Sequence, residues 1–380
     1  MIYLDHAATS FPKPSSVVRA VSGAITRAGG NPGRGSHLAA RLAAETVFSC
    51  REAVAALFGA PSPEQVIFTA NATAALNLVI KGLLRGGDHV LLSDLEHNAV
   101  LRPITALARA GRISYDIFPT FAARGRCEAG AICGAIERLI KPNTRLLICT
   151  HASNICSATL PLAEIGELCR RRGILFAVDA AQSAGRLPID VGALGIDALC
   201  APGHKGLLGP QGSGLLVLRE GLRLETLIEG GSGFSSLDPE MPPDPPERYE
   251  AGTLPTPAIA GLGAGIREVL RLGVDAIGAR EAQLCAYLSS LLCEIPGVTL
   301  YAPQHAGSIL LFSVEGMSPD AVGRELDRLG FAVRTGYHCA PLAHKTLGTP
   351  PGGAIRVGLG FGNTEDQLLA FSHAVRGLFG

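Results

Sequence analysis

The first candidate for a reactive group is Lys205, which lies just beyond the end of a predicted strand of a parallel sheet. Residues 198–201 form a short apolar run that breaks at Pro202 and Gly203, and His204 and Lys205 follow directly. An apolar run closed by turn residues predicts a buried strand that opens into a loop. Ligands of open α/β sheets bind beyond the carboxyl ends of such strands, and a desolvated lysine there can attack a carbonyl. Most lysines in this position are ordinary loop residues, so the prediction depends on the other strand ends.

Polar side chains also follow three further predicted strands. Each strand is a short apolar run, and a residue that can stack or hydrogen-bond comes within four positions of its end. Because the carboxyl ends of parallel strands meet at one edge of a sheet, we expect these residues to surround one ligand together with Lys205. The strands and residues are 89–93 with His97, 146–150 with Asn154, and 174–178 with Asp179 and Gln182.

A phosphate site is predicted between the strand at 66–69 and the helix that follows it. The small residues of this junction leave backbone N–H groups free at the positive end of a helix dipole, where an anion binds readily. Ala72 would offer its backbone and Thr73 its hydroxyl. Many α/β loops look alike here, so the junction is informative only beside the other strand ends.

The chain as a whole predicts an α/β fold with a mostly parallel, doubly covered sheet, because short apolar runs alternate with helical spacing. Helical spacing begins near Ser16, and Ser36 is the expected N-cap of a long second helix. The stiff, proline-rich stretch at 238–246 predicts a surface loop. We expect a large domain at 16–257 and a smaller α+β domain formed by 1–15 and 258–380.

The composition of the chain argues against several classes of protein. The 380 residues carry 33 basic and 33 acidic side chains, which argues against nucleic-acid or anionic-membrane binding. Mean hydropathy is +0.29, yet no apolar run approaches bilayer length. The ten cysteines form no CxxC pair, so no metal site is expected. The N-terminus lacks a basic segment followed by an apolar one, which favours a reducing cytoplasm, and a dimer interface could bury part of the apolar surface.

Cys339 and Arg356 are the candidate reactive groups of the C-terminal part. Cys339 lies in a glycine-interrupted stretch with Arg334 and His338, and cationic neighbours favour the nucleophilic thiolate. Local sequence alone leaves an inert, buried thiol equally plausible. Arg356 lies in a predicted strand, where an arginine more often forms a surface ion pair, although a guanidinium is also suited to bind a carboxylate through two hydrogen bonds.

Taken together, these motifs resemble the class V, fold-type I enzymes that use pyridoxal 5′-phosphate (PLP). More narrowly, the chain is similar to cysteine desulfurases and selenocysteine lyases over essentially its whole length. The matching motifs are Tyr3-Leu-Asp-His-Ala-Ala-Thr9, the loop from Asn31 to His37, Asn154, Asp179-Ala-Ala-Gln182, Gly203-His204-Lys205, Glu250-Ala-Gly-Thr253 and Arg334-Thr-Gly-Tyr-His338-Cys339-Ala.

The resemblance implies a role for each candidate at the cofactor. Lys205 would hold PLP as a Schiff base and move protons at the substrate α-carbon. Asp179 would pair with the pyridinium nitrogen, Gln182 would hydrogen-bond the phenolic oxygen, and His97 would stack on the ring. The phosphate would be bound by Ala72, Thr73 and His204, and by Thr253 of a neighbouring subunit, which implies a homodimer.

The resemblance also implies a substrate pocket and a sulfur carrier. Arg356 would bind the α-carboxylate of L-cysteine, and Asn154, Asn363 and Arg334 would complete the pocket. The Cys339 thiolate would attack the substrate sulfur, which leaves a persulfide on the enzyme and L-alanine as product, and the sulfur would pass to an acceptor protein. The alternatives are a selenocysteine lyase acting on L-selenocysteine, a class V aminotransferase or epimerase without sulfur chemistry, and a PLP-binding protein without turnover.

Two positions depart from the family pattern. Pro202 stands where many relatives carry a hydroxyl residue that contacts the phosphate, so one contact is expected to be missing. Tyr337 replaces a histidine that is common in the second group of desulfurases, to which the short Arg-x-Gly-x-His-Cys-Ala form belongs. His338, Cys339 and His344 could be combined into a metal trio, but persulfide chemistry explains this loop better.

Overall fold

The larger of the two main sheets has seven strands, and it confirms the predicted α/β class. The computed structural model describes residues 1–33, 35–125 and 127–379. The strand order is β2-β8-β7-β6-β5-β3-β4, and only β8 runs antiparallel to its neighbours. The strands are β2 Val66–Thr69, β3 His89–Ser93, β4 Ser114–Phe118, β5 Thr144–Thr150, β6 Leu175–Asp179, β7 Ala198–Pro202 and β8 Gly214–Leu218.

Helices cover both faces of this sheet because its strands are apolar on both faces. On β3, Leu91 belongs to one hydrophobic cluster, while Val90 and Leu92 belong to the other, as the two-residue period of a strand requires. One face carries α3 (Ala72–Leu83) and α4 (Asn98–Arg109). The other face carries α2 (Leu38–Phe58), α5 (Ala129–Leu139), α6 (Leu162–Arg172) and α7 (Thr256–Leu272).

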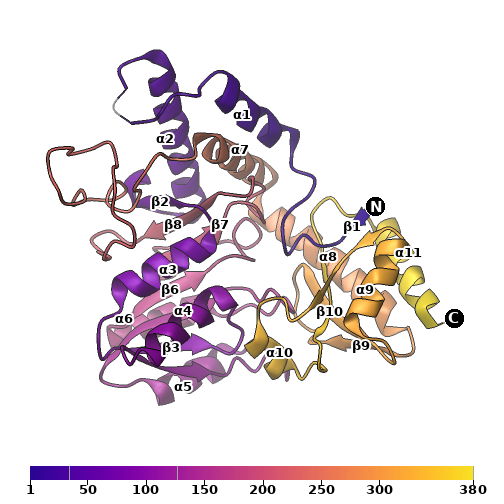
Figure 1. The fold of residues 1–380 in the computed structure, drawn as a ribbon. Coiled ribbons are helices and arrows are strands. Elements are labelled where there is room, and N and C mark those ends of the chain that lie inside the picture. The colour runs from indigo at the N-terminus through magenta and orange to yellow at the C-terminus, as the bar shows by residue number, and fades with distance from the viewer. Residues whose placement is uncertain (34, 126, 380) are drawn as a thin grey trace.

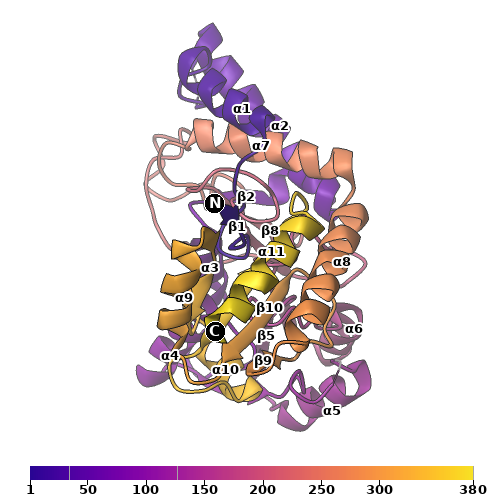
Figure 2. The ribbon, with the colours of Figure 1, turned by 90° about the vertical axis from the view of Figure 1, so that its right-hand side faces the viewer.

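A smaller antiparallel sheet lies beside the large one (Figure 1). Its strand order is β12-β13-β10-β9, and its helices pack on one face (Figure 2). On β13, Ile355 and Val357 face those helices, so Ala354 and Arg356 point to the other face, toward the large sheet. The strands are β9 Val298–Tyr301, β10 Ile309–Val314, β12 Arg334–Gly336 and β13 Ala354–Gly358, and the helices are α8 Val274–Cys293, α9 Pro319–Arg328 and α11 Glu365–Arg376.

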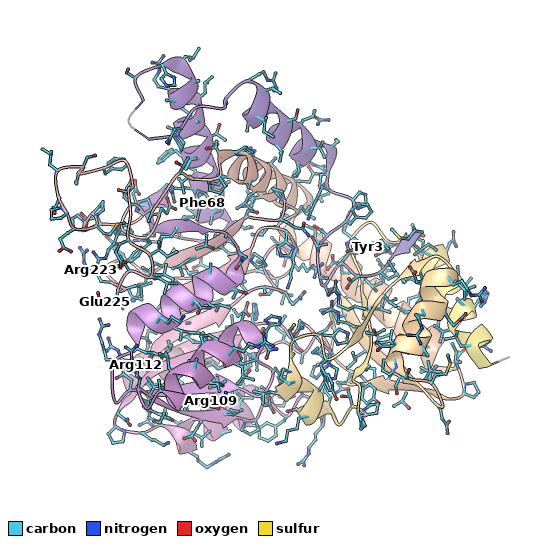
Figure 3. All side chains as sticks on the ribbon, in the orientation of Figure 1. Tyr3, Phe68, Arg109, Arg112, Arg223 and Glu225 are labelled. Carbon is cyan, nitrogen blue, oxygen red and sulfur yellow. The ribbon has the colours of Figure 1, made fainter. Side chains whose placement is uncertain are left out.

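The N-terminal segment returns to the smaller sheet. Strand β1 (Ile2–Tyr3) pairs in parallel with β11 (Phe331–Ala332), and Tyr3 lies where this segment passes between the two sheets (Figure 3). The domain division at residue 257 stays a prediction. Helix α7 packs against α1 (Ser15–Thr26) and α2 and contributes to the core beneath the large sheet, which favours a boundary nearer Gly273.

Local capping corrects one expectation. His37, not Ser36, is the N-cap of α2, and its Nδ1 accepts a hydrogen bond from the Ala40 N–H at 3.3 Å. Arg34, in the same glycine-rich loop, lies outside the described residues. Within the described ranges, no helix is both long and apolar enough to span a bilayer.

Glu250, part of a motif that carried the resemblance, fastens the chain beyond the proline-rich loop to the large sheet. Its Oε1 accepts from Arg51 Nη1 at 2.9 Å and from the Phe68 N–H at 2.6 Å. The Arg51 guanidinium lies 4.6 Å from the centre of the Phe68 ring, which is labelled in Figure 3. Both charged groups are buried, so each needs the other as a partner.

Candidate active site

Lys205 and Asp179 come from neighbouring strands and interact through their charges. Asp179 is the last residue of β6, and Lys205 follows β7 by three residues. The pKa of Lys205 is lowered to about 8, mainly by burial; the negative charge of Asp179 opposes the change, and the charge of Arg356 contributes to it. Burial also raises the pKa of Asp179, while the Ala181 N–H, at 2.9 Å, and Lys205 favour its ionised form. The lysine is therefore easier to deprotonate than in water.

Glycines allow the loops that follow β6 and β7 to touch. A Cβ atom on Gly206 would lie 2.3 Å from the carbonyl oxygen of Ala184, and one on Gly203 would lie 2.1 Å from Ser213 Oγ. Only a residue without a side chain permits both approaches. Gly206 therefore lets the lysine loop approach the loop that carries Gln182, whereas Gly203 lets the two ends of the lysine loop approach each other.

His97 supplies a neutral ring to the same site. It caps α4, and its Nδ1 accepts a hydrogen bond from the Ala99 N–H at 3.0 Å, so its Nε2 carries the proton. Burial lowers the pKa of His97 to about 4, and the charges of Lys205 and Arg356 contribute. The imidazole is thus uncharged near neutral pH and close to both cations.

The residues predicted to bind a phosphate include one unsatisfied donor group. His204 Nδ1 is buried and has no hydrogen-bond partner among the described residues. Ala72 and Thr73 begin α3 behind the N-cap Asn71, where backbone N–H groups lack intrahelical acceptors. A Cβ atom on Gly214 would lie 2.6 Å from the Asn71 backbone, so β8 starts directly against this helix end. An orphaned imidazole nitrogen and a free helix N-terminus fit a phosphate.

An aspartate that the sequence analysis left without a role connects the two candidate arginines. Asp5 Oδ1 accepts from Arg356 Nη2 at 3.0 Å, and Asp5 Oδ2 accepts from Arg334 Nη2 at 2.9 Å. Arg356 also donates from Nη1 to the carbonyl of Asn154 at 3.1 Å. Its Nε is buried and has no partner in the described part of the chain, which leaves one donor for a ligand. Asp5 stood in the opening motif, but its partners lie more than 300 residues away.

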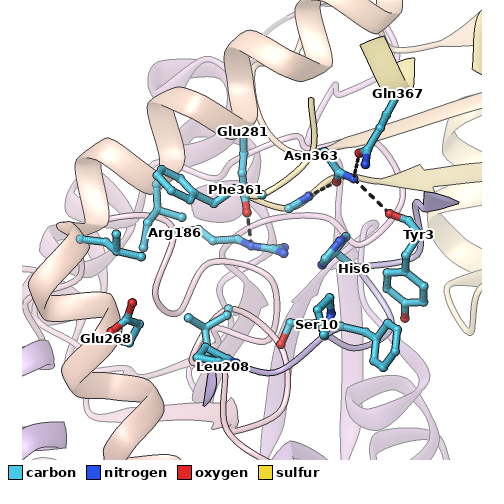
Figure 4. A pocket seen from close by; sticks show the side chains of 18 of the residues that line it. Tyr3, His6, Ser10, Arg186, Leu208, Glu268, Glu281, Phe361, Asn363 and Gln367 are labelled. Atoms are coloured by element: carbon cyan, nitrogen blue, oxygen red, sulfur yellow. Dashed lines mark hydrogen bonds and ion pairs between the residues drawn. The ribbon is translucent and has the colours of Figure 1, made fainter. Parts of the chain in front are cut away.

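Three predicted amide contacts have protein partners in this structure. Asn154 Nδ2 donates to the carbonyl of His338 at 2.9 Å, and Gln182 Nε2 donates to the carbonyl of Ala7 at 2.9 Å. Asn363 Nδ2 donates to the carbonyl of Tyr3 at 3.2 Å. Asn363 lines a cavity of about 460 Å³ beside the N-terminal segment, together with the buried pair Arg186 and Glu281 (Figure 4). Its proposed contact with substrate would compete with these bonds.

Cys339 is exposed at the tip of a loop between β12 and α10 (Pro341–Leu347). His338 and Cys339 both have positive φ angles, 49° and 57°, a conformation that costs a non-glycine residue about 1–2 kcal/mol. The Asn98 N–H donates to the Cys339 carbonyl at 2.7 Å. The pKa of Arg334 is raised mainly by its hydrogen bond to Asp5, and a thiolate at Cys339 would add to this shift. The thiol therefore lies near the arginine pair.

Thr253 lies elsewhere. It is exposed and lines a separate cavity of about 670 Å³ with Asn31, His37 and Phe48. None of the residues that line this cavity belongs to the group around Lys205. Its predicted role in a neighbouring subunit stays a prediction.

Glu96 was missed as a site residue, although it directly precedes His97. It is fully buried, and its Oε1 accepts from the Ser93 hydroxyl and from the Thr150 N–H, at 2.9 Å for the latter. Burial raises the pKa of Glu96 to about 8, and the charge of Asp179 contributes. The position of Glu96 just beyond the end of a predicted strand is the sequence signal that could have identified it as a site residue. Within the described ranges, no group of three His, Cys, Asp or Glu side chains could hold a metal ion.

Known proteins share this architecture. Residues 2–371 match the family described as aminotransferase class-V. A protein of Methanothermobacter thermautotrophicus named as a probable cysteine desulfurase is 34% identical over 377 residues, which cover 97% of this chain and 92% of that protein.

Solved structures agree over nearly the full length. The apo structure of a cysteine desulfurase from Thermococcus onnurineus NA1 matches with a TM-score of 0.90 and 31% identity, covering 99% of this chain and 94% of that chain. The cysteine desulfurase CsdA from Escherichia coli matches with a TM-score of 0.87 and 26% identity, with the same coverage. The fold is therefore fold type I, and the chain belongs to the aminotransferase class-V family.

Proposed function

We propose that this protein is a cysteine desulfurase that converts L-cysteine to L-alanine and carries the released sulfur as a persulfide on Cys339. The observation that carries the proposal is an exposed thiol on a loop whose carbonyls accept hydrogen bonds from Asn98, next to His97, and from Asn154, which itself accepts from Arg356. The relatives support it, since they are named for this activity rather than for selenocysteine lyase or aminotransferase activity.

PLP is the proposed cofactor, and class V aminotransferases generally depend on it. When bound, PLP would withdraw electrons from the substrate α-carbon. Lys205 and Asp179 would hold its two ends, His97 would lie on its ring, and Gln182 would contact its phenolic oxygen. Ala72, Thr73 and His204 would bind its phosphate, with Thr253 contributed by the second subunit of a homodimer.

The protein's own groups would then act in turn. The free Nε of Arg356 would bind the substrate carboxylate, with Asn154, Asn363 and Arg334 nearby as predicted. Lys205, whose pKa is about 8, would take the α-proton of L-cysteine.

The Cys339 thiolate would form an S–S bond with the substrate sulfur while the substrate Cβ–S bond breaks. The electron pair of the broken bond remains on the substrate, Cβ takes up a proton, and Lys205 returns the proton to the α-carbon, which gives L-alanine. The persulfide would pass its outer sulfur to an acceptor protein at the exposed face of the loop.

The test is mass spectrometry of the protein after incubation with L-cysteine. We expect one added sulfur atom on the Cys339 peptide and none after the substitution Cys339→Ala, which should also abolish alanine formation. Cys293→Ala is the matched control, because of the cysteines in the described part of the chain only Cys293 and Cys339 are exposed. Alanine formation that survives Cys339→Ala would contradict the persulfide route, and a stronger response to L-selenocysteine would favour the lyase.

A further inference from the structure

We infer that His344 is a positioning residue for sulfur transfer: it fixes His338, and through it Cys339, by a chain of side-chain hydrogen bonds that ends at Thr349. The inference rests on the proposed role of Cys339 and adds to it the residue that supports the Cys339 loop from α10. His344 lies in α10, the helix that directly follows the loop.

The chain of hydrogen bonds is continuous. His338 Nε2 lies 3.2 Å from the carbonyl oxygen of Arg334, and His338 Nδ1 lies 3.2 Å from His344 Nε2. His344 Nδ1 lies 2.8 Å from Thr349 Oγ1. The two imidazole planes differ by 13°, and their centroids are 5.4 Å apart. Every ring nitrogen of the pair therefore has a partner.

The proton positions in this chain follow from its first acceptor. A carbonyl oxygen can only accept, so His338 Nε2 must donate to Arg334. A neutral His338 then accepts at Nδ1, which requires His344 to donate from Nε2 and to accept from the Thr349 hydroxyl at Nδ1. Burial lowers the pKa of His338 to about 3 and that of His344 to about 4, and the charge of Arg356 adds to both shifts. Both rings are therefore neutral, and a single arrangement of protons satisfies them.

This chain supports a backbone that would otherwise relax. His338 and Cys339 are consecutive non-glycine residues with positive φ, and such conformations persist only where surrounding contacts impose them. The carbonyls of both residues accept hydrogen bonds from the large sheet's loops, through Asn154 Nδ2 and the Asn98 N–H. His344 holds the side chain of His338, which without it would keep only its hydrogen bond to the Arg334 carbonyl.

Tyr337 extends the same support. Its ring packs edge-on against His344 with centroids 5.3 Å apart, and its hydroxyl accepts from the Gly352 N–H at 3.0 Å. The tyrosine that departs from the family pattern thus braces the histidine chain. Side chains and backbone of α10 and of the turn after it therefore support the loop, while Cys339 stays exposed.

The experiment compares His344→Phe with His344→Gln in the full-length, cofactor-loaded protein. Phenylalanine keeps the bulk of the ring and removes both nitrogens, whereas glutamine keeps a side-chain N–H that can reach His338. For His344→Phe we expect kcat for alanine formation to fall about 10- to 100-fold with KM for L-cysteine within about twofold, because a small displacement of a reacting group has effects of this size. His344→Gln should recover most of kcat.

A second readout does not depend on the reaction. The alkylation rate of Cys339, measured by peptide mass spectrometry without L-cysteine and divided by that of Cys293, should change at least about threefold in His344→Phe and little in His344→Gln. This ratio tests the positioning role even if the wild-type protein makes no persulfide, so failure of the proposed function would be seen separately.

Two outcomes would overturn the inference. One is a His344→Phe protein with unchanged kcat and unchanged Cys339 alkylation. The other is a lowered melting temperature with normal kcat per folded protein, which would make His344 a stabilising residue only. If His344→Phe does not fold, Thr349→Val removes the hydroxyl that donates to His344 Nδ1, and it should lower kcat several-fold with KM unchanged; no change would count against the chain of hydrogen bonds.

Discussion

The two halves of the site are built in different ways. The sheet-edge half consists of His97, Asp179 and Lys205, which all follow strands of one sheet. The crossing half consists of Asp5, Arg334, Arg356 and the Cys339 loop, and it joins the first residues of the chain to its C-terminal part through ion pairs. The first half takes its geometry from regular backbone, whereas the second depends on side-chain contacts between distant segments.

This difference indicates which half can move. Residues at the ends of hydrogen-bonded strands are fixed by the whole sheet, and cofactor chemistry needs that precision. The crossing half is held by two arginines on one carboxylate and by a loop with positive φ angles, so a few substitutions should displace it. We expect substitutions in the first half to remove chemistry and those in the second to change substrate affinity or sulfur transfer.

The largest expected effect is at Lys205. Lys205→Ala should lower alanine formation about 10³-fold or more, since it removes the amine that moves the proton, while the melting temperature changes little. Lys81→Ala, on the exposed face of α3, is the control for loss of a lysine and should leave the rate of alanine formation unchanged. Activity above about a tenth of wild type in Lys205→Ala would place the proton chemistry outside the sheet-edge half.

Asp5→Asn should produce the next largest effect. It breaks both ion pairs and leaves Arg356, which is 3% exposed, without an anionic partner, and breaking a buried pair is costly. We expect KM for L-cysteine to rise about 10-fold or more with a smaller change in kcat, measured by steady-state alanine release.

Arg334→Gln is the matched control for Asp5→Asn. It removes only the partly exposed pair, which is worth about 1 kcal/mol or less, so KM should rise only a few-fold. An equal rise in both variants would instead mean that Arg334 contributes as much to substrate binding as Asp5 and its two ion pairs do together.

The same contrast explains how much could be predicted from sequence. Six of the seven strands of the large sheet, all but β4, and the lysine loop followed from apolar runs and turn residues, because the sheet edge is a local pattern repeated along the chain. Arg356 was expected as a carboxylate ligand, but nothing local indicates that Asp5 shares it. The pairing of residues 5 and 356 arises only when β1 joins β11 and Asp5 bridges to Gly358.

The chain of hydrogen bonds from His338 through His344 to Thr349 could not be predicted from the sequence either. His338 and His344 are six residues apart, and with Cys339 they could be combined into a metal trio, although persulfide chemistry was the better explanation of the loop; nothing in the local sequence indicates a hydrogen bond between the two rings. The backbone turns at His338 and Cys339 with positive φ angles, and the two rings lie edge to edge in nearly parallel planes, joined by a hydrogen bond. Such angles are rare outside glycine and have no clear sequence pattern here.

Glu96 offers a finer test of the sheet-edge half through its pH dependence. A glutamate in the unfolded chain ionises near its ordinary value of 4.5, but the pKa of the buried Glu96 is raised to about 8. Between these values the folded protein holds one more proton than the unfolded chain, so this group makes the free energy of unfolding fall as pH rises. The raised pKa of Asp179 acts in the same direction, whereas the lowered pKa of Lys205 acts oppositely and mainly above pH 8.

Glu96→Gln keeps an acceptor for the Thr150 N–H and removes the ionisation. The loss of unfolding free energy between pH 5 and pH 8, measured by denaturant titration, should therefore shrink by on the order of 1–3 kcal/mol. Glu45→Gln, at an exposed position of α2, should leave the pH dependence as in the wild type. If Glu96→Gln also leaves it unchanged, Glu96 is ionised at neutral pH, and the sheet-edge half holds a second negative charge beside Asp179 that its geometry would have to accommodate.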